Sequence, residues 1–158
     1  MTGAAADVTG GGGARGPGRV AALDLGARRI GVAFSDTRRS LASPWGTIER
    51  SGDPARDRAA VVGAVREVEA TTVVVGLPLS LSGERGPAAR AALEETTALR
   101  AALEPLGVTV ETADERLTTV EAQRALRAAG HSTKSSRRVV DSAAAMVLLQ
   151  SWLDGARS

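Results

Sequence analysis

The sequence contains no cysteine and no tyrosine, and its 158 residues include one histidine, His131. Without cysteine the chain can form no disulfide, no thiolate metal site and no cysteine nucleophile. Aromatic residues make up only 2% of the chain, too few for the stacking surfaces of proteins that bind single-stranded nucleic acid. No apolar run reaches the roughly 18 residues that a membrane-spanning helix needs. We therefore expect a protein that does not interact with membranes.

The first 18 residues, MTGAAADVTGGGGARGPG, are rich in glycine and alanine and show no hydrophobic periodicity. Such a segment cannot bury a core, so we expect a disordered tail over residues 1–18 and one folded domain over residues 19–154. The segment also lacks the charged-then-apolar order of a secretory signal. The expected location of the protein is therefore the cytoplasm.

Neither sign of charge is in large excess, because 20 Lys and Arg residues stand against 18 Asp and Glu residues. The formal net charge is +2, and Lys134 is the only lysine. The net charge therefore says little about nucleic-acid binding, and the placement of individual charges carries more information.

Five short apolar runs have the length and residue types of β-strands. They cover residues 19–25, 29–35, 41–48, 71–76 and 108–112. The first two runs are joined by a glycine-containing turn and predict a β-hairpin. Pro44 weakens the third run, whereas the fourth, TTVVVG, is typical of a buried central strand. The Gly-Leu-Pro segment at 76–78 is expected to end that strand and shape a cleft, since it lacks the Gly-Lys-Ser/Thr of a phosphate-binding loop.

Four helices are predicted around these strands. Asp53 and Pro54 mark the first as N-cap and first helical residue, and Pro87 opens the second. Thr118 begins a capping box, TTVE, for the third helix, and the fourth is expected from about residue 140 to 153. The predicted buried faces are Val61, Val65 and Val68, then Ala92, Thr96, Leu99 and Leu103, then Ala122, Ala125, Leu126 and Ala129. The order predicts an α/β fold with antiparallel opening strands and parallel later strands.

Asp24 is an acidic residue inside the first predicted strand. Strand alternation places it on one face with Ala22, opposite Leu23 and Leu25. A carboxylate beside a buried strand is unfavourable unless it is paired or binds a cation. The alternative is that Asp24 only caps the turn at Gly26.

Two more acidic sites occur late in the chain. Asp114 and Glu115 follow the fifth predicted strand, and such a pair in a loop can simply be exposed to solvent. Asp141 opens the last helix and is expected to point toward the sheet, unless it acts only as an N-cap or first-turn acid. The face that it shares is apolar and contains Ala145, Leu148 and Trp152.

Together, these acids can converge on one point of the folded domain. A cluster of carboxylates repels itself and needs a hard divalent cation to offset that repulsion. With no cysteine and one histidine, Mg²⁺ or Mn²⁺ suits this chain better than Zn²⁺. Carboxylates that hold two such ions about 4 Å apart serve in phosphodiester cleavage.

Four stretches carry a resemblance to a known family. They are ALDLGARRIGVA (22–33), VGLP (75–78) with the loop to Pro87, DERLTTVEA (114–122) and VDSAAAMVLLQ (140–150). In this order and spacing they are similar to the YqgF (RuvX) group of pre-16S rRNA nucleases, also described as Holliday-junction-resolvase-like proteins. The resemblance spans residues 19–153. It implies an RNase H-like fold, with a mixed five-stranded sheet flanked by helices, and a two-metal-ion nuclease.

Carried over by position, the resemblance implies that Asp24, Glu115 and Asp141 are the catalytic residues and the ligands of Mg²⁺ or Mn²⁺. Asp24 would bridge two ions, while Glu115 and Asp141 would complete one site each. Asp114 is the alternative to its neighbour Glu115. Such a centre activates water and needs no side-chain nucleophile.

Basic residues stand close in sequence to each of these acids. They are Arg28 and Arg29 after Asp24, Arg116 after Glu115, and Lys134, Arg137 and Arg138 before Asp141. We expect them to bind the phosphates of a substrate. The alternative is that arginine is merely abundant in this chain.

The expected function is 5′-end processing of pre-16S rRNA during ribosome biogenesis, by a hydrolase acting on ester bonds. Branched DNA such as a Holliday junction is the alternative substrate for the same metal centre. A non-catalytic nucleic-acid-binding module is the alternative of another class, and the presence of all three acids argues against it. An actin-like ATPase would need two such domains. The expected partner is nucleic acid, with the chain a monomer or weak homodimer.

Overall fold

The computed structural model describes residues 18–78, 86–115, 120–130 and 142–157. The predicted tail lies outside these residues except for Gly18, and the capping residue Thr118 also lies outside them. No helix among the described residues has the length and apolar character that crossing a bilayer requires.

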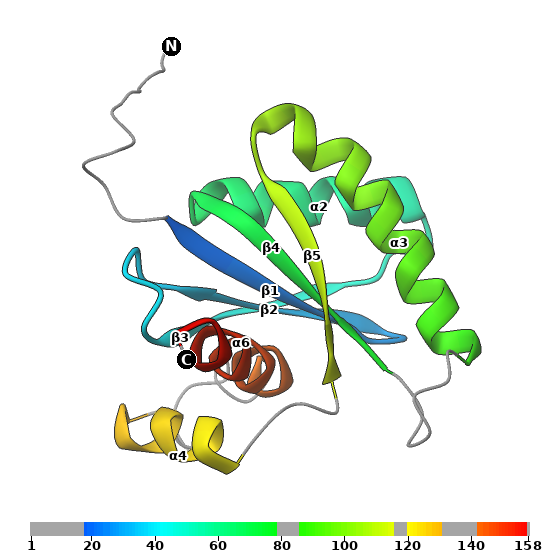
Figure 1. Ribbon diagram of the computed structural model, residues 1–158. Coiled ribbons are helices and arrows are strands. Elements are labelled where there is room, and N and C mark those ends of the chain that lie inside the picture. Colours follow the sequence, from blue (N-terminus) through cyan, green and yellow to red (C-terminus); the bar gives the residue numbers. More distant parts are fainter. Residues whose placement is uncertain (1–17, 79–85, 116–119, 131–141, 158) are drawn as a thin grey trace.

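A mixed five-stranded sheet of order β3-β2-β1-β4-β5 forms the centre of the molecule (Figure 1). β1 pairs antiparallel with β2, and β2 with β3, whereas β1–β4 and β4–β5 are parallel. The predicted antiparallel opening and parallel continuation are therefore confirmed. The strands are β1 (Arg19–Leu25), β2 (Arg29–Ser35), β3 (Ala42–Glu49), β4 (Ala70–Leu77) and β5 (Thr109–Asp114).

Helices cover both faces of the sheet (Figure 1). α2 and α3 pack on one face, α6 packs on the other, and α4 packs against α6. Apolar residues on both faces of the central strands β1 and β4 are therefore buried, in an arrangement of three layers. The helical elements are α2 (Pro54–Glu67), α3 (Pro87–Leu103), the short 3₁₀ helix η2 (Glu104–Leu106), α4 (Val120–Ala128) and α6 (Ala143–Arg157).

The local signals for the starts of α2 and α3 are confirmed. The Asp53 side chain accepts a hydrogen bond from the Ala55 N–H at 3.0 Å, and Pro54 occupies the first turn of α2. Pro87 likewise opens α3. The predicted end of the last helix at residue 153 is too early. The Gln150 Nε2 donates to Asp154 Oδ1 at 3.1 Å, which supports another turn of α6.

Pro44 lies inside β3, where the sequence pattern is weakest. β3 is an edge strand, where proline is tolerated because about half of the backbone N–H groups face away from the sheet. Val32 pairs with Gly46 and Ala33 pairs with Pro44, which leaves Trp45 as the extra residue of a bulge. The strand therefore tolerates its proline at an irregular edge.

The sheet separates two hydrophobic cores. Under α2 and α3, the buried residues include Leu23, Ile30, Val61, Val73 and Leu103. Under α6, they include Val20, Ala22, Val74, Met146 and Leu149. The predicted faces of α2 and α3 are buried as expected. In α4, only Ala122 and Leu126 are buried, and the prediction for Ala129 is wrong because it lies beyond the helix and is exposed.

Candidate active site

Asp24 lies near the end of β1 and is half-buried. Its neighbour Ala22 belongs to the core under α6, whereas Leu23 and Leu25 pack in the core under α2 and α3. Asp24 therefore points to the α6 side of the sheet, as strand alternation predicts. Its register partner on β2 is Gly31, which has no side chain to fill the space beside the carboxylate.

Glu115 follows β5 directly and lies over Gly76 of β4. A Cβ atom built on Gly76 would lie 2.9 Å from Glu115 Cγ, 3.1 Å from Glu115 Oε2 and 2.9 Å from Leu148 Cδ2. Real side chains do not approach so closely, so the absence of a side chain at position 76 is what allows Glu115 to occupy this place. The glycine thus shapes the cleft, as expected for the Gly-Leu-Pro segment, and does so by direct contact with an acid.

Asp24 and Glu115 line one pocket of about 340 Å³. Its other lining residues are Gln123 of α4 and Ala143, Ala144, Val147 and Leu148 of α6. Two acids far apart in the sequence are thus brought together between the strand ends and the last helix. Sequence reasoning missed Gln123, because an exposed glutamine on a helix carries no pattern that would mark it.

The environment of the pocket disfavours negative charge. Burial raises the pKa of the Asp24 carboxyl above its usual value. The pKa of Glu115 is raised by burial first, and then by the negative charges of Asp24 and Asp114. A cation bound beside these two carboxylates would favour their charged forms.

The donor set suits a hard divalent ion. Both acids offer carboxylate oxygens, which Mg²⁺ and Mn²⁺ prefer. Among the described residues, no group of three or more Asp, Glu, His or Cys side chains could hold a metal ion. Asp141, the third predicted ligand, lies outside the described residues.

The start of α6 is fastened to the far edge of the sheet. The buried Ser142 Oγ donates to Gly46 O at 3.0 Å. The buried Gln150 Oε1 accepts from Ala42 N–H at 2.9 Å, and its Nε2 donates to Ser40 O at 3.0 Å. These bonds fix the helix that forms one wall of the Asp24 pocket. Sequence reasoning missed them because it considered only the apolar face of this helix.

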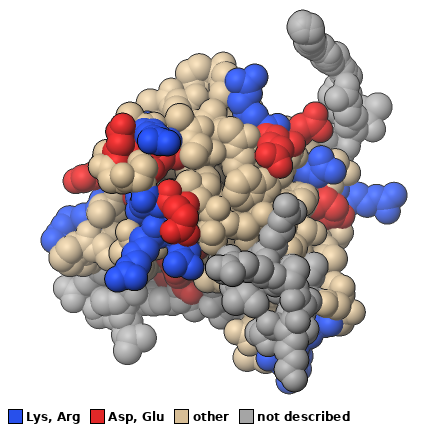
Figure 2. Space-filling model, turned by 180° about the vertical axis from the view of Figure 1, so that it is seen from behind, with Lys and Arg blue, Asp and Glu red and all other residues tan. Residues whose placement is uncertain are grey.

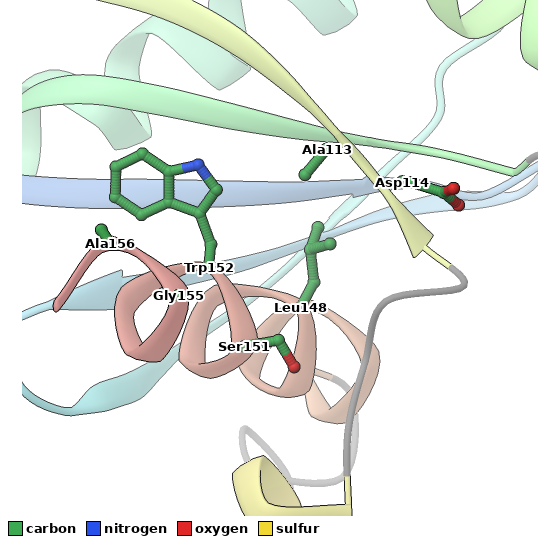
Figure 3. Close-up of a pocket in the computed structure, with 7 residues that line it drawn as sticks. All are labelled: Ala113, Asp114, Leu148, Ser151, Trp152, Gly155 and Ala156. Atoms are coloured by element: carbon green, nitrogen blue, oxygen red, sulfur yellow. The ribbon is translucent and has the colours of Figure 1, made fainter. Parts of the chain in front are cut away.

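A second pocket of about 310 Å³ lies between α6 and the end of β5 (Figure 3). Leu148 lines both pockets, and Asp114 lines only the second. The structure therefore brings Glu115, and not its neighbour Asp114, into the pocket with Asp24. The second pocket is lined by Ala113, Asp114, Leu148, Ser151, Trp152, Gly155 and Ala156.

Two of the predicted phosphate-binding residues are described. Arg28 and Arg29 are exposed at the β1–β2 turn, and Arg29 lies 3.6 Å from Glu49. Arg28 lines a groove beside α2 and α3, not the pocket of Asp24. The remaining candidates lie outside the described residues: Arg116, Lys134, Arg137 and Arg138.

A family model described as "RuvX: Holliday junction resolvase" matches residues 18–155. The chain belongs to the RuvX family. The match includes Asp24, Glu115 and the segment between α4 and α6, so it spans the whole candidate site. The predicted family is thereby confirmed.

Relatives in Rhodococcus and Mycobacterium are close to this chain in sequence. A protein of Rhodococcus opacus is 48% identical over 142 residues, which cover 88% of this chain and 79% of that protein. A protein of Mycobacterium ulcerans is 47% identical over 145 residues, covering 90% of this chain and 82% of that protein. Both carry the provisional name pre-16S rRNA nuclease.

Solved structures with a similar fold are more distant in sequence. RuvC of T. thermophilus, in complex with a Holliday junction substrate, has a TM-score of 0.64 at 16% identity, covering 88% of this chain and 94% of that chain. Ydc2, the yeast mitochondrial Holliday junction resolvase, has a TM-score of 0.57 at 10% identity, covering 88% and 79%. The RuvX chain therefore has the RNase H-like fold of these resolvases.

Proposed function

We propose that this RuvX chain is a metal-dependent nuclease that hydrolyses phosphodiester bonds, with Asp24, Glu115 and Asp141 as catalytic residues. The observation that carries the proposal is the pocket shared by Asp24 and Glu115. Both carboxyls are half-buried and their pKa values are raised, by burial in both and in Glu115 also by the charge of Asp24. A folded protein that keeps two such acids together does so at a cost in stability, which points to a bound cation.

The same three acids would hold Mg²⁺ or Mn²⁺. When bound, a pair of these ions activates a water molecule for attack and stabilises the leaving oxygen. Asp24, on a rigid strand, is suited to bridge two ions, and Glu115 and Asp141 would each complete one site. Glu115 is held over Gly76, so its carboxylate needs little reorganisation to take up this role.

The substrate that we propose is the precursor of 16S rRNA, cleaved in the maturation of its 5′ end in the cytoplasm. The names of the close relatives support RNA, whereas the description of the family and the distant resolvase structures favour branched DNA as the second candidate. A carboxylate-held metal centre cleaves either backbone. The chain would act as a monomer or a weak homodimer.

Positive charge near the acids would bind the phosphates of the substrate. We assign this role to Arg28, Arg29, Arg116, Lys134, Arg137 and Arg138. Arg28 and Arg29 are exposed at the β1–β2 turn, which closely follows Asp24 in the chain. Gln123 adds a neutral polar group on the α4 side of the pocket.

The test is cleavage of pre-16S rRNA fragments and of four-way DNA junctions by the purified protein with Mg²⁺ or Mn²⁺. Asp24→Asn and Glu115→Gln should each lower the rate of cleavage by at least about 100-fold. Loss of a group that only orients a metal ligand already lowers activity by about 10–100-fold, and loss of the ligand itself should cost at least as much. Both variants should fold, because each removes a charge that the fold disfavours.

Glu111→Gln is the matched control, since Glu111 is exposed on the same strand that leads to Glu115. It should cleave as the unmodified protein does. Full activity in Asp24→Asn, or no metal-dependent cleavage of either substrate by the unmodified protein, would contradict the proposed function. The preferred substrate decides between RNA processing and junction resolution.

A further inference from the structure

Arg50 holds the turn between β1 and β2 at two points. Its backbone N–H donates to Arg28 O at 3.0 Å, and its side-chain Nε–H donates to Gly26 O at 2.7 Å. Arg50 directly follows the end of β3 and thus bonds to both ends of the segment Gly26–Arg28. This segment is the connection that directly follows the end of β1.

The same turn is tightly coupled to Asp24. The Gly26 N–H donates back to Asp24 O at 3.0 Å. A Cβ atom at Gly26 would lie 2.6 Å from Arg29 O, so the turn has no room for a side chain at this position. A shift of Gly26 would therefore displace the backbone that carries the Asp24 carboxylate.

The guanidinium of Arg50 also reaches helix α3. Its two terminal nitrogens lie 3.2 Å and 3.0 Å from the two carboxylate oxygens of Glu95. This two-pronged geometry orients the guanidinium strongly, and the two side chains are only 22% and 36% exposed. By contrast, the pair Arg100–Glu104 is longer, at 3.8 Å, and more exposed. The Arg50–Glu95 pair is therefore suited to hold the Arg50 guanidinium in one orientation.

The groove beside α2 and α3 is poorly suited to bind phosphate next to Arg50 itself. It has a volume of about 810 Å³ and is lined by three arginines and four carboxylates. Figure 2 shows Lys, Arg, Asp and Glu side chains interspersed on the face seen from behind. Since the acids outnumber the bases and Arg50 is already bonded to Glu95, an anion gains little there.

We propose that Arg50 is a positioning residue of the nuclease site. Through Gly26 O it fixes the turn that sets the place of Asp24, and through Glu95 it anchors that turn to α3. Arg50 contacts neither substrate nor metal in this scheme. The proposal rests on the proposed function, because the role of Asp24 defines what is being positioned.

The test compares Arg50→Lys and Glu95→Gln with the unmodified protein. Lysine keeps the charge of Arg50 but cannot bond to Gly26 O and to both Glu95 oxygens at once. For Arg50→Lys we expect faster hydrogen exchange of the amides in residues 24–30. We also expect a larger dissociation constant for Mn²⁺, measured by calorimetry. The kcat for cleavage should fall about tenfold with KM unchanged, as for other groups that orient metal ligands. Glu95→Gln should change the same quantities in the same direction, by less.

Arg100→Lys and Glu104→Gln are the matched controls from the exposed pair on α3 and η2, and neither should alter exchange at residues 24–30. Unchanged exchange and Mn²⁺ affinity in Arg50→Lys would overturn the proposal. A raised KM with unchanged kcat would also overturn it, because Arg50 would then be a substrate contact. If the unmodified protein cleaves nothing, the proposed function fails, while exchange and Mn²⁺ binding still decide the role of Arg50.

Discussion

At the scale of single residues, the candidate site depends on a missing side chain as well as on its acids. Glu115 reaches the pocket of Asp24 across Gly76, where even a methyl group would meet Glu115 and Leu148. The side chains of Glu115 and of Leu148 in α6 therefore both lie against Gly76, where β4 has no side chain. This arrangement links the glycine of the VGLP stretch to the position of one acid.

Gly76→Ala should therefore impair the site directly. The new Cβ would lie 2.9 Å from both Glu115 Cγ and Leu148 Cδ2, so the acid or the helix must move. We expect the cleavage rate to fall at least about tenfold. Overpacking should also lower the free energy of unfolding by about 1–3 kcal/mol. Cleavage assays and denaturant titration measure the two effects.

Gly63→Ala provides the control for this substitution. Gly63 lies inside α2, and apart from its chain neighbours and the backbone of its own helix nothing lies within 4 Å of a Cβ built there. Alanine should leave cleavage unchanged and raise stability by about 0.5–1 kcal/mol, since glycine is unfavourable in a helix interior. If Gly76→Ala cleaves as well as Gly63→Ala does, the contact between Gly76 and Glu115 has no functional role.

Residue roles could be predicted from the sequence only where the signal is local. Alternation along β1 predicts the face on which Asp24 lies. The resemblance to a family indicates Glu115 and leaves Asp114 as the alternative, and the pocket contains Glu115. The bonds of Arg50 could not be predicted, because Gly26 and Glu95 are remote in sequence and come near only in the folded chain.

At the scale of elements, the first turn of α2 has two acidic residues with separate tasks. Asp53 caps the helix, whereas Asp57 accepts hydrogen bonds from the Ser51 N–H at 2.9 Å and the Ser51 Oγ at 2.7 Å. The Ser51 hydroxyl and then the Ser51 N–H lower the pKa of Asp57, with help from the charges of Arg50 and Arg56. The buried Asp57 therefore ties the β3–α2 connection to the helix.

This lowered pKa predicts how stability depends on pH. The unfolded chain binds the proton of Asp57 more readily than the folded chain does, so the stabilisation is complete above the ordinary pKa of 3.8. It is lost as the pH falls below that value toward the lowered pKa of the folded state. Asp57→Asn should therefore reduce the melting temperature at pH 7 and have a smaller effect at pH 3.

Ser51→Ala should show the same trend, because it removes the hydroxyl that bonds to Asp57. Melting curves of both variants and of the unmodified protein at the two pH values provide the measurement. An equal loss of melting temperature at pH 7 and pH 3 would show that Asp57 acts through packing alone.

Element boundaries, like residue roles, can be predicted from the sequence where the signal is local. The starts of α2 and α3 are predicted because Asp53, Pro54 and Pro87 act on their own helices. α6 extends past residue 153 to Arg157, and its last turns include a hydrogen bond between the side chains of Gln150 and Asp154. The tolerance of β3 for Pro44 depends on its edge position, which the order of the whole sheet determines.

At the scale of the whole molecule, topology creates the site. β1, β4 and β5 are adjacent and parallel, so their carboxyl ends meet at one edge of the sheet. This edge brings Asp24 of β1 together with Glu115 after β5, and α6 closes the pocket from one side. Local patterns predict the antiparallel and parallel parts of the sheet, but the order of its strands is a property of the complete fold.

The most direct test of this account is a crystal structure of the protein grown with Mn²⁺, with the ions located by anomalous scattering. We predict two ions about 4 Å apart, with the Asp24 carboxylate between them. Glu115 should contact one ion and Asp141 the other, each with oxygens at about 2.1 Å. If no ion contacts Asp24 and Glu115 at millimolar Mn²⁺, or if Asp114 is the ligand in place of Glu115, the central claim is contradicted.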